Sequence, residues 1–238
     1  MSDRSRIVFI SFFIIVGVLL AFFISCERLE EKSVSVDTGL IDTLVIDAGH
    51  GGEDGGAITK DGIRESRINL EITKKMAGLC DFSGIPYILT RDSEDIDYPE
   101  ELNTTRKRKI YDQNRRVDLV NELDNAVLIS IHQNKFTSGK PRGPQVFYSD
   151  ADGSKELAEL IQLNMSTVLY PQNRRVAASV SDKIFLMKKV NCTAVLAECG
   201  FLSNPTEAAA LGDGDYQNKV ALCIISAYCK YSDNKQIS

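Results

Sequence analysis

The 238-residue sequence contains no tryptophan and only two histidines, His50 and His132. It also lacks the short motifs of several common catalytic sites. There is no G-x-x-x-x-G-K-[ST] phosphate loop, no H-E-x-x-H zinc motif and no G-x-S-x-G nucleophile turn. A dinucleotide fingerprint that starts at Gly49 and Gly51 fails because Asp54 stands where the third glycine is required. The sequence therefore gives no support to the usual nucleotide-binding or serine-hydrolase sites.

Positive charge is not in excess either. The 28 Lys and Arg residues face 33 Asp and Glu residues, which gives a net charge of -5 and argues against a nucleic-acid partner. None of the six cysteines has C-x-x-C spacing, so a structural zinc knot is not expected. An apolar fraction of 43% is too high for a disordered chain and is sufficient for one sizeable domain.

One long hydrophobic run is present near the start of the chain. Residues 7–26 carry no charge, and a helix of that length reaches about 30 Å, the thickness of the bilayer core. Arg4 and Arg6 precede the run, so the positive-inside rule places the rest of the chain outside the cytoplasm. We expect residues 1–26 to be a membrane anchor and residues 27–42 a polar linker. A cleaved signal peptide, which would leave a secreted protein, is the closest alternative.

Residues 43–231 have the pattern of one α/β domain, followed by a short tail at 232–238. Apolar runs predict strands, and helical spacing of apolar residues between them predicts helices. This alternation indicates an open, mostly parallel or mixed sheet of about six strands with helices on both faces. The predicted strands span residues 44–48, 85–90, 126–131, 143–149, 183–187 and 193–198.

Three of these strands end in residues that can do chemistry, and open α/β sheets bind ligands beyond the carboxyl ends of their strands. His50 follows the first strand, His132 the third, and Glu198 ends the last. With Glu65, the two histidines would supply the three N/O ligands that a catalytic zinc site needs, and Glu198 would be the base. Each residue alone has an ordinary explanation, such as a surface histidine or a glutamate that favours a helix dipole. Spacing alone does not show that these distant segments converge.

Five segments carry a family likeness: IDAGHGGEDGGA (46–57), GIRES (62–66), LTR (89–91), SIHQN (130–134) and AECGFLSNPTEAAAL (197–211). Taken together, they resemble the zinc-dependent N-acetylmuramoyl-L-alanine amidases of the type 3 family. The resemblance implies that His50, Glu65 and His132 bind one Zn²⁺ per chain and that Glu198 is the catalytic carboxylate. It extends over nearly all of residues 43–231.

Within that family the chain is most similar to the germination-specific amidases of spore formers. The insertion after Arg91, with its basic segment at 105–116, and the strand GPQVFYS at 143–149 carry this likeness. It implies a peptidoglycan substrate in the spore cortex, a step toward muramic-δ-lactam, and an activating lipoprotein partner. We expect Asn134 and Arg91 to contact substrate. The basic segment is either a flexible arm that contacts substrate or activator, or a solvated insertion.

Lys188, Gln133 and Cys199 depart from the usual family pattern. The predicted ligand positions and the predicted base still carry the residues that the family has there. Three other functions remain open from the sequence. The protein could be a vegetative cell-wall amidase, a related zinc peptidase that cuts elsewhere in the stem, or a catalytically silent wall-binding protein of the same fold.

Overall fold

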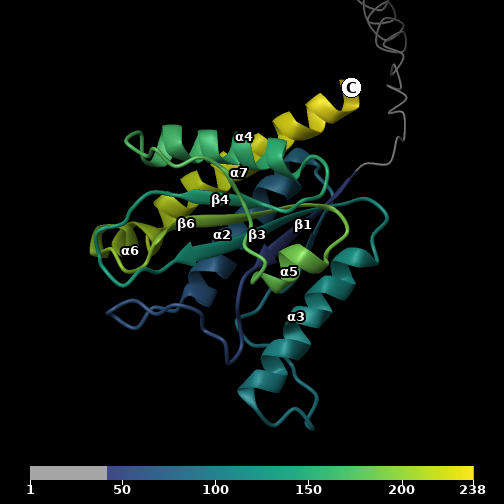
Figure 1. Ribbon diagram of the computed structural model, residues 1–238, viewed down its shortest axis with the longest axis vertical. Coiled ribbons are helices and arrows are strands. Elements are labelled where there is room, and N and C mark those ends of the chain that lie inside the picture. The colour runs from purple at the N-terminus through teal and green to yellow at the C-terminus, as the bar shows by residue number, and fades with distance from the viewer. Residues whose placement is uncertain (1–41, 238) are drawn as a thin grey trace, which may run out of the picture. The chain divides into compact units, whose positions relative to one another are not determined.

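A computed structural model describes residues 42–237 (Figure 1). The strands are β1 (Thr43–Ala48), β2 (Tyr87–Leu89), β3 (Ala126–Asn134), β4 (Gln145–Tyr148), β5 (Ala178–Ser179) and β6 (Thr193–Phe201). The helices are α2 (Glu65–Ser83), α3 (Thr105–Asn121), α4 (Ser154–Leu169), α5 (Phe185–Lys189), α6 (Pro205–Leu211) and α7 (Gly214–Ile237).

The six strands of the described region form a single mixed sheet in the order β2-β1-β3-β6-β4-β5. Strands β2, β1, β3 and β6 run parallel to one another, and β4 runs antiparallel to β6. The carboxyl ends of β1, β3 and β6 therefore meet at one edge of the sheet. The predicted open α/β sheet of about six strands is confirmed.

Side chains alternate between the two faces of each strand, and both faces are covered. Leu44 and Ile46 of β1 belong to a core cluster with α2, α4 and α7. Val45 points the other way, into a smaller cluster with residues of α3 and α5. In Figure 1, α4 and α7 lie above the strands, and α5 and α3 lie below them. Every strand residue thus has a defined face, which decides what can meet at the carboxyl edge.

The predicted strand at residues 183–187 is wrong. The structure places helix α5 (Phe185–Lys189) there, and the outer edge of the sheet is formed instead by the short strand β5. The segment contains four consecutive apolar residues, 184–187. Such a run is compatible with either a buried strand or one turn of buried helix, because it is too short to show a period. Met187 is buried as a helical residue beneath the sheet.

The basic segment at 105–116 is neither a flexible arm nor simply a solvated insertion. It forms the first part of the continuous helix α3, whose N-cap Thr104 accepts a hydrogen bond from the backbone of Lys107 at 3.3 Å. Asp112, Arg116 and Val120 recur every four residues and form the buried stripe of the helix. One face of this charged helix therefore belongs to the interior.

The remaining predictions concern the two ends of the chain, namely the anchor with its linker and the C-terminal tail. The anchor at 1–26 and nearly all of the linker at 27–42 lie outside the described residues. Within residues 42–237, no helix is both long and apolar enough to cross a membrane. At the other end, α7 continues to Ile237, through most of the residues predicted to form a tail.

Candidate metal centre and catalytic cleft

His50 occupies a left-handed turn directly after β1. Its φ is 62°, and the following Gly51 and Gly52 have φ values of 133° and 56°. Gly51 and Asp54 close the turn with reciprocal backbone hydrogen bonds of 2.9 and 3.0 Å. A positive φ is uncommon outside glycine and costs about 1–2 kcal/mol. The contacts around His50 must therefore hold it in this conformation.

Three distant segments meet at this turn. Glu65 is the first residue of α2, and His132 lies near the carboxyl end of β3. Glu65 Oε1 lies 3.4 Å from His50 Nε2 and 3.1 Å from His132 Nδ1. One nitrogen from each histidine and one Glu65 oxygen all lie within 4.8 Å of one another. The structure thus brings together the three side chains that the sequence proposed as ligands.

Glu65 is held rigidly in this group. Its Oε2 accepts a hydrogen bond from the backbone of Ala57 at 2.8 Å, and its Oε1 accepts one from the backbone of Gln133 at 3.0 Å. Burial opposes its ionisation, but hydrogen bonds to His132 and His50 outweigh burial and keep the pKa of Glu65 well below its usual value. The carboxylate is therefore ionised and aimed between the two imidazoles.

The second ring nitrogen of His50 is also engaged. Its Nδ1 lies 3.0 Å from Asp54 Oδ2, and that oxygen lies 2.7 Å from Lys109 Nζ. Burial disfavours the imidazolium, but hydrogen bonds to Asp54 and Glu65 outweigh it and raise the pKa of His50 to about 9. A carboxylate that fixes the far nitrogen of an imidazole is the usual support of a metal-binding histidine. Asp54 and Lys109 play this orienting part here.

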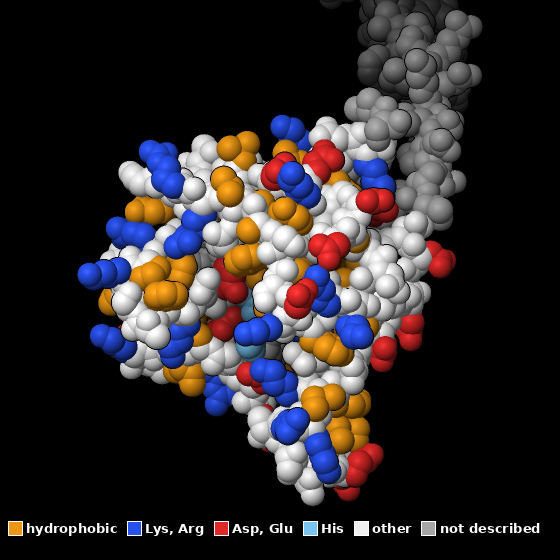
Figure 2. Space-filling view, viewed as in Figure 1, with side chains coloured by type: hydrophobic (Ala, Val, Ile, Leu, Met, Phe, Trp, Pro, Cys, Tyr) orange, Lys and Arg blue, Asp and Glu red, His pale blue; other side chains and the backbone are white. Residues whose placement is uncertain are grey.

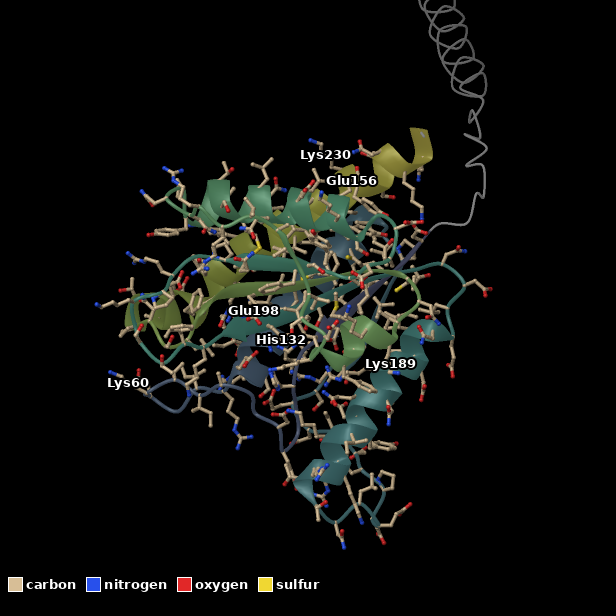
Figure 3. The ribbon with its side chains drawn as sticks, in the orientation of Figure 1. Lys60, His132, Glu156, Lys189, Glu198 and Lys230 are labelled. Atoms are coloured by element: carbon tan, nitrogen blue, oxygen red, sulfur yellow. The ribbon has the colours of Figure 1, made fainter. Side chains whose placement is uncertain are left out.

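Glu198 lies beside the group on the neighbouring strand. It is the direct cross-strand partner of His132, and Figure 3 shows the two side chains next to each other at the ends of β6 and β3. Its Oε2 is buried and has no hydrogen-bond partner among the described residues. Burial is the main reason that the pKa of Glu198 is raised to about 7. A carboxyl group with this pKa takes up and releases a proton near neutral pH.

These residues line a cleft of about 460 Å³ on the face of the sheet that carries α3 and α5. Figure 2 shows red and pale blue side chains at the bottom of a hollow, with blue Lys and Arg side chains around it. Asn134, Lys135 and Lys183 also line the cleft. Asn134 therefore lines the cleft, and its contact with substrate stays a prediction.

Arg91 does not line this cleft. Its side chain is buried, and its guanidinium group donates to the backbone carbonyls of Ala48, His50 and Ser66 at 3.0, 2.8 and 2.7 Å. The direct substrate contact expected of Arg91 therefore has no support in the geometry. Arg116 of α3 is buried near the same turn, where it donates to the carbonyls of Ala48 and His50. Its role and those of Asp54 and Lys109 were not predicted from the sequence. The position of Asp54, four residues after His50, was the one local signal for this support.

Cys199 is excluded as a nucleophile by its position. It follows Glu198 on β6, so its side chain points to the opposite face of the sheet and joins the large apolar core cluster. Burial raises the pKa of its thiol above the usual value. The chemistry of the cleft therefore rests on the histidines and carboxylates.

Comparison with known proteins agrees with this geometry. The family described as N-acetylmuramoyl-L-alanine amidase matches residues 44–230. The germination-specific N-acetylmuramoyl-L-alanine amidase of Bacillus subtilis is 35% identical over 193 residues, which cover 81% of this chain and 80% of that protein.

Two solved structures are also similar. The CwlD amidase from Clostridioides difficile, in complex with the GerS lipoprotein, is 40% identical, with a TM-score of 0.76 over 80% of this chain and 98% of that one. An N-acetylmuramoyl-L-alanine amidase from Clostridium difficile 630 is 29% identical, with a TM-score of 0.70 over 82% of this chain and 98% of that one. The chain belongs to the N-acetylmuramoyl-L-alanine amidase family.

Proposed function

We propose that the protein hydrolyses the amide between the lactyl group of N-acetylmuramic acid and L-alanine with one Zn²⁺ held by His50, Glu65 and His132. The observation that carries the proposal is the convergence of their three donor atoms within 4.8 Å, beside a carboxyl oxygen that has no partner. Two imidazole nitrogens and one carboxylate oxygen are a donor set typical of catalytic zinc. When bound there, zinc polarises a carbonyl oxygen and lowers the pKa of water.

Glu198 supplies the proton transfers in this proposal. Its carboxylate accepts a proton from the attacking water and then donates it to the leaving amine of L-alanine. Both transfers require a carboxyl group that changes protonation near neutral pH, and the raised pKa of Glu198 meets this requirement. The presence of this carboxyl together with all three donors also argues against a silent wall-binding protein.

We further propose that the substrate is the peptidoglycan of the spore cortex, where the reaction precedes muramic-δ-lactam formation. The similarity to a germination-specific amidase supports this assignment over a vegetative wall substrate. An activating lipoprotein partner is supported by the similar amidase that was solved in complex with a lipoprotein. Cleavage elsewhere in the peptide stem is the main alternative reaction.

The proposed layout follows from an extracytoplasmic substrate. Residues 1–26 would anchor the chain in the membrane or direct its secretion, and residues 27–42 would link that segment to the catalytic domain at 43–231. The amidase would then face the spore envelope from the outer side of the membrane. The uncharged run at residues 7–26 supports this layout.

Digestion of purified cortex peptidoglycan, followed by mass spectrometry, tests the reaction. We expect free peptide stems that begin with L-alanine, and glycan strands whose lactyl carboxyl groups are free. The digestion is run with the protein alone and with spore extract, because a missing activator would mask the activity. Stems cut between amino acids would support the peptidase, and an absence of new ends in both reactions would contradict the amidase.

The affinity of the metal-free protein for zinc should increase with pH. His50 carries a proton below its pKa of about 9, and that proton must leave before its Nε2 can bind a cation. The affinity should therefore rise by up to about tenfold per pH unit between pH 7 and 9. Competition with a chromophoric chelator measures this slope. Asp54→Asn removes a hydrogen bond that raises the pKa of His50, so its slope should level off at lower pH; equal profiles for both proteins would contradict the account.

A further inference from the structure

The three consecutive carbonyl groups of Ala48, Gly49 and His50 are held by buried side chains from α2, from α3 and from the loop after β2. Each carbonyl accepts two side-chain hydrogen bonds. Arg91 and Arg116 both donate to Ala48 O, at 3.0 and 2.7 Å, and both donate to His50 O, at 2.8 and 2.6 Å. The Gly49 carbonyl accepts from Asn69 at 3.0 Å and from Arg91 at 3.3 Å. Such dense bonding of a turn fixes the direction of every peptide plane in it.

Arg91 also ties this turn to the helix that carries Glu65. Its Nη2 donates to the carbonyl of Ser66, the next residue along α2, at 2.7 Å. On its far side the guanidinium donates to the Ser93 carbonyl at 2.9 Å and lies 3.5 Å from a Glu94 oxygen. One planar group thus connects the segments of His50 and Glu65.

Arg116 ties the same turn to the strand that carries His132. It contacts the buried Asp47 at 2.6 Å, and the other oxygen of Asp47 accepts a hydrogen bond from Ser130 of β3 at 2.5 Å. Ser130 lies two residues before His132 and on the same face of the strand. Asp112, one turn earlier on α3, fixes the opposite edge of the guanidinium at 2.7 Å.

We propose that Arg91 and Arg116 act as an arginine clamp, a pair of positioning residues that set the zinc affinity of the site. The clamp holds His50 in its left-handed conformation and locks the segments of all three donor side chains to one another. The inference rests on the proposed zinc site and adds to it the residues that organise it. Neither guanidinium needs to touch the cation or the substrate for this role.

Lysine cannot replace either arginine in the clamp. A guanidinium group presents five N–H donors in a fixed plane, whereas an ammonium is a single charged point. Arg116→Lys retains a positive charge near Asp47 but cannot span the Ala48 and His50 carbonyls while it also contacts Asp112. Arg91→Lys leaves no buried carboxylate unpaired, because within the described part of the chain Arg91 contacts one carboxylate, that of the partly exposed Glu94. Arg91→Lys is therefore expected to disturb folding less than Arg116→Lys does.

The test measures the zinc dissociation constant of metal-free wild-type, Arg91→Lys and Arg116→Lys proteins by chelator competition. We expect both lysine variants to bind zinc about 10- to 100-fold more weakly, the size of effect seen when groups that orient ligands are lost. Circular dichroism and melting of the metal-free proteins establish that the variants are folded. Should Arg116→Lys fail to fold, Arg91→Lys alone decides the outcome.

Two controls separate positioning from general stability. Arg106→Lys makes the same substitution at an exposed position on α3, and Ile161→Val trims a buried methyl group on the other side of the sheet. Both should bind zinc within about twofold of wild type, even though Ile161→Val lowers the melting temperature. Zinc affinities of the folded clamp variants within threefold of wild type would overturn the clamp and leave the proposed function intact. A wild-type protein that binds no zinc would instead overturn both.

Discussion

Replacing Glu198 by glutamine should reduce the rate of amide hydrolysis by about 100- to 10,000-fold while leaving zinc binding intact. Glutamine has nearly the shape of glutamate, but it cannot accept the proton of water or return it to the leaving amine. Glu198 is not one of the three donor residues, so the zinc dissociation constant should stay within about threefold of the wild-type value. Counting new L-alanine amino termini per minute measures the rate.

The stability of the glutamine variant provides a check on its fold. The folded-state pKa of Glu198 lies near 7, above its ordinary value of 4.5, so the ionised carboxylate destabilises the metal-free fold. That penalty develops between about pH 4.5 and 7 and is complete above pH 7. Metal-free Glu198→Gln should therefore melt no lower than wild type at pH 8.

Glu156→Gln, on α4 at the other side of the molecule in Figure 3, is the matched control and should retain full activity. A Glu198→Gln variant that hydrolyses at the wild-type rate would remove Glu198 from the mechanism.

Replacing His132 by alanine should weaken zinc binding by more than 100-fold and abolish hydrolysis at micromolar zinc. The substitution removes one of three donors outright, a larger change than the 10- to 100-fold losses that follow from disturbing an orienting group. It also takes away the 3.1 Å contact that holds Glu65 Oε1 in place. Metal content after dialysis and the rate of stem release are measured on the same preparations.

Asn134 offers the matching control on the same strand. It lines the cleft two residues after His132 but is not part of the donor group. Asn134→Ala should therefore keep its zinc, and if Asn134 contacts the substrate, the KM should rise with little change in kcat. Equal zinc affinities for the His132→Ala protein and wild type would show that the cation binds elsewhere.

The sheet and the layers of helices were predictable because strong local patterns encode them. The apolar runs at 44–48, 126–131 and 193–198 have the length and composition of buried strands, and they form β1, β3 and β6. The segment 183–187 carries no such information, since its four apolar residues fit a strand or a helical turn equally well. Its burial beneath the sheet as α5 depends on contacts with distant residues.

The site was predictable as a set of residues but not as a geometry. Family resemblance singled out His50, Glu65 and His132, and the sheet register then placed His132 directly opposite Glu198. Register depends on pairing between strands that are far apart in the chain, so no local sequence pattern predicts it.

Arg116 is a residue for which the sequence pattern predicts the wrong environment. A basic run ordinarily predicts a solvated surface, yet this arginine is buried because Asp47 and Asp112 compensate its charge. Asp47 lies 69 residues away from Arg116 in the sequence, so no local pattern predicts that the two side chains pair.

The most direct test of the account is a zinc titration of the metal-free protein during cortex digestion. The reaction contains spore extract from which metal ions have been removed. The quantity measured is the rate at which stems with free L-alanine amino termini appear. We predict no release without zinc and a linear rise that stops at one zinc per chain, because residues 42–237 contain one group of three such donors. Release that is equally fast without zinc, or stems that never begin with L-alanine, would contradict the account.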